Sequence, residues 1–279
     1  MVATHSIRPL LRWLPFQFGK GKLAHYLLQP AEIPTTDVRT KSGVLVRTAQ
    51  DKMYRDIYLY GEYEQNLTAR IRNIVKPGFT CLDIGANFGY YSVLLAKLAG
   101  SHGSVHAFEP VPFIYRLAQE TVKHNGVEGR VSLSNCGLGG RSGEFTVYSF
   151  SQLPHGQASF NDLGRPDAVP HRCRVITLDE YADERGLRAV DFVKADIEGD
   201  ELGALSGGER LLRRSDAVIA FEINIPCLKA RHLEPRAVED FLRGCGYTEF
   251  LQVPVHRGAR KVAHLWPELG CDYMAFKSD

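Results

Sequence analysis

Short apolar runs alternate with longer amphipathic segments through most of the chain. Each run is bounded by polar or glycine-rich residues, which is typical of buried strands separated by helices. The main runs lie at 79–82, 104–108, 131–135, 189–195 and 217–221. Strand and helix alternating in this way predict a doubly wound α/β sheet, mostly parallel and covered on both faces.

Weaker patterns flank this repeat. Loose alternation over 38–60 predicts two or three short strands, and 61–75 predicts an amphipathic helix. Two antiparallel strands should bracket the polar 151–170 segment, and we predict a terminal antiparallel strand pair over 247–253 and 272–276.

The N-terminal segment differs in composition from the rest. Residues 1–31 contain no Asp or Glu but carry four Lys and Arg side chains among aromatic and Leu residues. Such a segment can touch a membrane surface, or pack as an arm on its own domain or on a second subunit, giving a homodimer. Pro9 and Pro15 would interrupt a long helix. We therefore expect an extension over 1–60 and one domain over 61–279.

Composition narrows the class of protein. Of 279 residues, 44% are hydrophobic and 24% charged, which is ordinary for a globular protein. A net charge of +2 gives no field that would indicate nucleic-acid binding. The six cysteines show no metal-ligand spacing and predict reduced core thiols in a cytoplasmic protein. The sequence also lacks an apolar run long enough for a transmembrane segment.

A glycine-rich bend follows the first main run. Residues 76–92 read KPGFTCLDIGANFGYYS, with Asp83 at a predicted strand end and a helix starting near Tyr90. Acid, glycines and helix start in this order are typical of cofactor sites in open α/β sheets. The spacing is not G-x-G-x-x-G, so a pyrophosphate site is the weaker interpretation. An acid here suits a cationic ligand such as S-adenosylmethionine.

Carboxylates follow four of the five main strands, where ligands bind in such sheets. The strand-end residues are Asp83, Glu109, Asn135, Asp196 with Glu198, and Glu222. Because a carboxylate only accepts hydrogen bonds, Glu109 can bind both ribose hydroxyls of an adenosine ligand. Residues 135–138 would flank the adenine.

Taken together, these motifs resemble the FkbM family of S-adenosylmethionine-dependent methyltransferases. The resemblance rests on LDIGANFGYYS, HAFEP, ITLDEY, VDFVKADIEGDELGALSGG and AVIAFEIN, and covers roughly 61–224. It implies a class I methyltransferase fold, S-adenosyl-L-methionine as cofactor, and a hydroxyl of a natural product or sugar as acceptor. Ala195 departs mildly from the expected larger apolar residue.

The resemblance also implies site residues. Asp83, Gly85, Asn87 and Gly89 would hold the methionine part and Glu109 the ribose, while Asp196 and Glu198 would lie beside the sulfonium and the acceptor. The full predicted cofactor set is Glu64, Asp83, Gly85, Ala86, Asn87, Gly89, Tyr90, Ser92, Glu109, Pro110, Asn135, Gly137, Leu138 and Asp196.

Methylation of a neutral hydroxyl needs a base within hydrogen-bond reach. The candidates are Asp196, Glu198, Glu222 and His155. The same three carboxylates could instead bind Mg²⁺, although we predict no metal. The 151–170 segment is a candidate acceptor lid, and Tyr60, Tyr63 and Glu64 could close the opposite side. Two other functions stay open at this point, a nicotinamide-dependent oxidoreductase and a catalytically silent cofactor-binding module.

Overall fold

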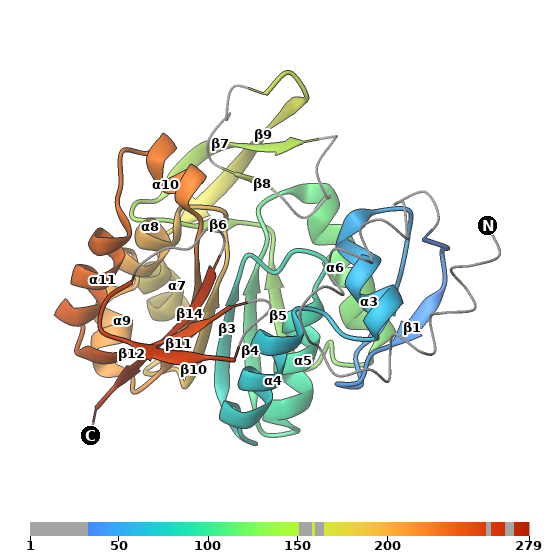
Figure 1. The fold of residues 1–279 in the computed structure, drawn as a ribbon, viewed down its shortest axis with the longest axis horizontal. Helices are drawn as coiled ribbons and strands as arrows, with labels where there is room; N and C mark the ends of the chain where they lie inside the picture. The colour runs from blue at the N-terminus through green and yellow to red at the C-terminus, as the bar shows by residue number, and fades with distance from the viewer. Residues whose placement is uncertain (1–32, 151–157, 160–164, 255–257, 266–270, 279) are drawn as a thin grey trace.

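A mixed sheet forms the centre of the molecule (Figure 1). The computed structural model describes residues 33–150, 158–159, 165–254, 258–265 and 271–278. Within these residues the central sheet has eight strands in the order β13-β12-β14-β11-β10-β3-β4-β5. The strands are β3 (Thr80–Ile84), β4 (Ser104–Phe108), β5 (Val131–Ser134), β10 (Phe192–Ala195), β11 (Val218–Ile223), β12 (Tyr247–Val253), β13 (Arg260–Val262) and β14 (Cys271–Lys277).

Strand directions agree with the predicted class. The five strands from β5 to β11 pair in parallel. Strand β14 is antiparallel to both of its neighbours, β11 and β12, and β13 adds an antiparallel edge that the sequence did not predict. This is the doubly wound, mostly parallel α/β architecture that the sequence predicts, with the expected terminal antiparallel pair.

Helices cover both faces of the sheet. Helices α4 (Gln65–Ile74), α5 (Tyr90–Ala99) and α6 (Pro112–His124) contribute to one core cluster. Helices α7 (Leu178–Arg185), α8 (Glu201–Ser206), α9 (Glu209–Arg214) and α11 (Pro235–Gly244) contribute to the other. On β3, Cys81 belongs to the first cluster and Leu82 to the second, because successive side chains point to opposite faces. Both faces are therefore buried.

Residues 33–60 pack on the first of these clusters. Strands β1 (Asp37–Arg39) and β2 (Leu45–Arg47) form an antiparallel pair, followed by the 3-10 helix η2 (Lys52–Tyr54) and α3 (Arg55–Tyr60). The prediction of strand is right for the first part and wrong for 55–60, which is helical. All four residues from Ile57 to Tyr60 are buried, and a short fully buried run has no periodicity that separates helix from strand. Residues 1–31 and the predicted arm lie outside the described residues.

A second, smaller sheet lies beyond the carboxyl ends of the parallel strands (Figure 1). It consists of β6 (Gly137–Leu138), β7 (Gly143–Phe150), β8 (Ala158–Ser159) and β9 (Ala168–Ile176), in the order β6-β9-β7-β8. Strands β7 and β9 pair antiparallel, as predicted. Val147 and Cys173 of this sheet pack on Val111 and Ile114 near the start of α6. The small sheet therefore stands over the edge where ligands bind.

One predicted helix is two helices. The segment after Glu198 forms α8 and α9, which are separated at Gly207 and Gly208. A Cβ on Gly207 would lie 2.2 Å from the carbonyl oxygen of Gly139, so close packing on the neighbouring loop explains the break. The short helix α10 (Ile225–Ala230) was not predicted. No helix among the described residues has the length and hydropathy needed to cross a bilayer.

Candidate functional site

A cavity of about 240 Å³ opens at the carboxyl ends of β3, β4, β10 and β11. The small sheet contributes to its wall through Val147 and Ala158. Twelve predicted site residues line it: Glu64, Gly85, Ala86, Asn87, Tyr90, Glu109, Pro110, Gly137, Leu138, Asp196, Glu198 and Glu222. Asp83, Gly89, Ser92 and Asn135 do not line it. Segments far apart in the sequence are thus brought together at one place.

The glycine-rich bend forms the floor of the cavity. Gly85 has a φ of +84°, and a Cβ there would lie 2.0 Å from the carbonyl oxygen of Asp196. The backbone N–H groups of Gly85 and Ala86 donate to the carbonyl oxygen of Phe108, at 3.0 and 2.9 Å. Gly89 has another role, because a Cβ there would lie 3.1 Å from Ala118 of α6. It permits helix packing instead of contact with a ligand.

Asp83 lies beneath the cavity. It is the fourth residue of β3 and fully buried, not a residue of the loop after the strand. Its Oδ2 accepts a hydrogen bond of 2.6 Å from Ser92 Oγ, whereas its Oδ1 is buried without a partner among the described residues. Burial raises the pKa of Asp83. The predicted direct contact of Asp83 and Ser92 with a ligand therefore does not match their place behind the wall.

Glu109 is held by backbone donors. Its Oε2 accepts from the N–H of Asn87 and its Oε1 from the N–H of Val111, both at 3.0 Å. Burial raises the pKa of Glu109 to about 7. Asn135 donates to the carbonyl oxygens of Glu109 and Pro110, at 2.9 and 3.0 Å, so it fixes this loop instead of facing a ring in the cavity.

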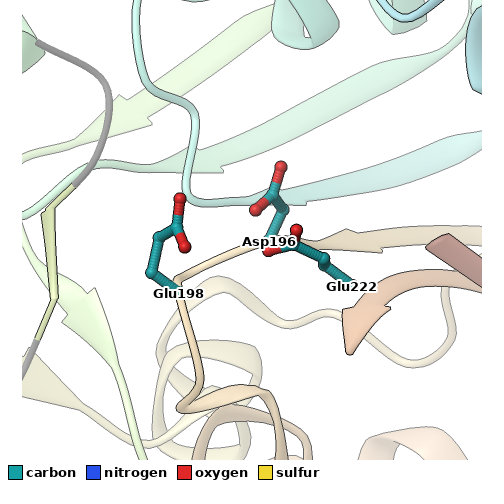
Figure 2. Close-up of side chains that lie close together, drawn as sticks. All are labelled: Asp196, Glu198 and Glu222. Carbon is teal, nitrogen blue, oxygen red and sulfur yellow. The ribbon is translucent and has the colours of Figure 1, made fainter. Parts of the chain in front are cut away.

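Three carboxylates, here called the acidic trio, meet at the other end. Asp196 and Glu198 lie in the loop after β10, and Glu222 lies in β11. Figure 2 shows the three side chains converging from these two neighbouring segments. One carboxylate oxygen of each lies within 4.8 Å of the others, a spacing that one divalent cation could also bridge. Burial, and then the charge of Asp196, raise the pKa of Glu198 and of Glu222. Glu198 and Glu222 therefore retain their protons at pH values where isolated carboxylates would lose them.

The backbone around Glu198 is constrained. Glu198 has a φ of +56°, which is unusual for a residue with a side chain. Next to it, a Cβ on Gly199 would lie 2.3 Å from the Cβ of Cys227. Glu201 Oε1 accepts from the N–H groups of Ile197 and Gly199, and Asn224 donates to Glu198 Oε2 at 2.6 Å. These contacts hold the Glu198 carboxylate in the cavity wall.

Lys194 also lines the cavity, although it is not among the site residues that the sequence predicts. It is 4% exposed, and its Nζ lies 3.1 Å from Asp196 Oδ2 and 4.7 Å from the centroid of the Tyr91 ring. Burial lowers the pKa of Lys194, but the carboxylates of Asp196, Asp83 and Glu64 raise it by more, so the ammonium stays charged. The signal was present in the motif K-x-D, because residues two apart in a strand point to the same side.

The remaining predicted residues differ in where they lie relative to the cavity. Tyr63 and Glu64 line the cavity, as expected for residues that close it, whereas Tyr60 is buried in α3 away from it. His155 lies outside the described residues, as does most of the predicted lid. Of the described part of that segment, 158–159 and 165–170, Ala158 lines the cavity.

Sequence comparison gives a family. Residues 83–249, more than half of the chain, match the sequence profile described as the methyltransferase FkbM domain. The chain is 24% identical to the Pseudomonas aeruginosa AMB antimetabolite synthetase AmbE over 223 residues, which is 68% of this chain and 10% of that protein. It is 28% identical to the Streptomyces tacrolimicus 31-O-demethyl-FK506 methyltransferase FkbM over 162 residues, 48% of this chain and 61% of that one. The matched region therefore spans less than two thirds of either relative.

Two further proteins are similar to the chain. Methyltransferase sdnD of Sordaria araneosa is 24% identical over 177 residues, 54% of this chain and 68% of that protein. Among solved structures, the chain is similar to methyltransferase FkbM from Methylobacillus flagellatus KT, with a TM-score of 0.46 and 16% identity. That similarity covers 80% of this chain and 52% of the other.

Proposed function

The chain belongs to the FkbM family of methyltransferases, and from this premise we propose that it transfers a methyl group from S-adenosylmethionine to a hydroxyl oxygen of a small natural product or sugar. The observation that carries this proposal is one cavity with an adenosine-type acceptor, Glu109, at one end and the acidic trio at the other. Asp196 of the trio supplies a carboxylate that can remove the hydroxyl proton.

The residues present fit this cofactor. Glu109 offers acceptor oxygens beside the glycine-rich bend, where ribose hydroxyls need them. Five carboxylates and a single lysine among the described residues line the cavity, which suits a ligand carrying a sulfonium and an ammonium group. Pro110 and Leu138 would contact the adenosine, and Gly85 to Asn87 with Glu64 the methionine part.

The chemistry is a displacement at carbon. When bound, S-adenosylmethionine supplies an electrophilic methyl group, whose bond to sulfur breaks with the electron pair staying on sulfur as the acceptor oxygen attacks. Asp196 is the first candidate to accept the proton that the hydroxyl loses, because Lys194 and the preceding strand β10 fix its position. The rest of the wall aligns the acceptor and excludes water.

An oxygen acceptor is supported by one relative. The Streptomyces tacrolimicus protein is named for methylation at an oxygen, in 31-O-demethyl-FK506. The family also favours methyl transfer over the nicotinamide-dependent oxidation considered from the sequence alone.

Calorimetry followed by a transfer assay tests the proposal. We expect binding of S-adenosylmethionine and S-adenosylhomocysteine, no binding of NAD, and transfer of labelled methyl to members of a panel of polyhydroxylated compounds. A matched control variant is Asp240→Asn, which changes an exposed acid on α11 that does not line the cavity. Binding of NAD alone would contradict the proposal. Cofactor binding with no transfer to any member of the panel would instead indicate the silent module.

A further inference from the structure

Lys194 is a buried lysine whose side chain lines the cavity. It lies in β10, paired in register with Asp83 of β3 and Ala220 of β11, and its side chain reaches the cavity. An ammonium group has three hydrogen-bond donors. Among the described residues it makes one hydrogen bond, to Asp196 Oδ2, and one cation–π contact, to Tyr91. A buried cation with unused donors faces the cavity.

An anionic partner lies at the same end. Glu64 precedes α4 with a φ of +39°, and its Oε2 accepts a hydrogen bond of 2.7 Å from the hydroxyl of Tyr91. Tyr91 therefore separates the two charges, with Lys194 against the ring and Glu64 on the hydroxyl. A positive and a negative group that flank one aromatic ring in a cavity wall are complementary to a zwitterion.

The charge of the rest of the wall fixes where an anion can go. The other charged residues that line the cavity are Glu109 and the acidic trio, all acids, and Lys194 is the one base among the described lining residues. A ligand carboxylate placed elsewhere would face like charges in a poorly solvated space.

We propose that Lys194 binds the α-carboxylate of the cofactor's amino-acid part and that Glu64 binds its α-ammonium group. This inference rests on the proposed function, since it assigns residues to one end of the same ligand. It also fixes the orientation of that ligand, with the adenosine toward Glu109.

The test compares ligands that share the adenosine but differ in the amino-acid part. S-adenosylhomocysteine has both charges, its decarboxylated analogue has only the ammonium, and 5′-methylthioadenosine has neither. In calorimetry, Lys194→Met should weaken the binding of S-adenosylhomocysteine by about 10- to 100-fold, which is the range expected for loss of a charge-assisted hydrogen bond. Affinity for the decarboxylated analogue and for 5′-methylthioadenosine should change by less than about threefold, and Lys194→Arg should retain part of the lost affinity.

Glu64→Gln gives the complementary pattern. It should weaken S-adenosylhomocysteine and the decarboxylated analogue and leave 5′-methylthioadenosine unchanged. Lys261→Met, at an exposed lysine on β13, is the matched control and should alter none of the three affinities. Equal weakening of all three ligands by a folded Lys194→Met, or no weakening of any, would overturn the assignment and leave Lys194 as a positioning residue for Asp196.

A measurement on the unmodified protein removes dependence on how the variants fold. It should bind S-adenosylhomocysteine at least about tenfold more tightly than the decarboxylated analogue. Equal affinities would overturn the inference while leaving the proposed function intact. Failure of the unmodified protein to bind S-adenosylhomocysteine or 5′-methylthioadenosine would instead reject the proposed function itself.

Discussion

The two ends of the cavity hold their carboxylates in opposite ways. At the glycine-rich end, Glu109 accepts hydrogen bonds from two backbone N–H groups. At the other end, Asp196, Glu198 and Glu222 crowd together, with Lys194 and Asn224 as their side-chain partners. Backbone N–H groups hold a carboxylate in place before any ligand binds. Crowded carboxylates repel one another instead, and a ligand that brings positive charge or donates a proton to them relieves this repulsion. The first end is suited to recognition and the second to chemistry.

The largest effect should come from the chemical end. Asp196→Asn should lower turnover by about 100- to 10,000-fold, since an amide cannot take the acceptor proton. Affinity for 5′-methylthioadenosine, a ligand of the other end, should stay within about threefold. The measurements are labelled-methyl transfer and calorimetry. Near-normal turnover with unchanged cofactor affinity would remove Asp196 from the mechanism.

Gly85 lies where the two ends of the cavity meet, because its backbone packs against the carbonyl group of Asp196. Gly85→Ala should destabilise the fold by about 3 kcal/mol or more, because a Cβ 2.0 Å from the Asp196 carbonyl adds a clash to the cost of a positive φ. Gly126→Ala is the matched control, since its φ is +64° with nothing within 4 Å of the added Cβ. It should cost about 1 kcal/mol. If urea unfolding gave the same loss of unfolding free energy for Gly85→Ala and Gly126→Ala, backbone strain alone would account for both losses.

The recognition end should show a distinct pH dependence of stability. Burial raises the pKa of Glu109 from 4.5 to about 7, so the folded state holds this proton more tightly than the unfolded state does. The group therefore favours folding at pH below 4.5 and loses that contribution as the pH rises to 7, by about 3 kcal/mol. Raising the pH from 5 to 7.5 should therefore lower the unfolding free energy of the unmodified protein more than that of Glu109→Gln. The variant should gain in stability relative to the unmodified protein over this range. A difference that is constant with pH would contradict this origin.

The smallest effect is on binding at that same end. Glu109→Gln should weaken S-adenosylhomocysteine and 5′-methylthioadenosine by a similar factor, about 10-fold, because both carry the ribose that Glu109 would accept from. A loss confined to S-adenosylhomocysteine would place Glu109 at the amino-acid part and reverse the orientation inferred above.

Regular strands were predictable because their apolar runs have clear ends. The prediction for 104–108 coincides with β4. The parallel direction of the main strands follows from the alternation of strand and helix along the chain. Asp83 shows the limit. β3 extends to Ile84, so Asp83 belongs to the strand and its side chain is buried below the loop. A boundary shift of one or two residues changes what a side chain faces, and apolar runs do not fix boundaries so finely.

The electrostatics of the site depend on contacts that a sequence pattern does not contain. The carboxylates of the acidic trio were all predicted from strand ends, but the contacts among Lys194, Tyr91 and Glu64 join three segments that are distant in sequence. Similarly, α3 was mistaken for strand because all of Ile57 to Tyr60 is buried. Packing by the rest of the fold decides such segments, and local patterning cannot.

Strand β14 has a consequence for how the chain reaches this fold. It lies between β11 and β12, with Ile219 opposite Ala275 on one side and Phe250 opposite Ala275 on the other. Until residues 271–277 have been synthesised and inserted, β11 and β12 each present an open edge to other chains. Insertion of β14 therefore completes the sheet and covers two strand edges that would otherwise be open to pairing with another chain.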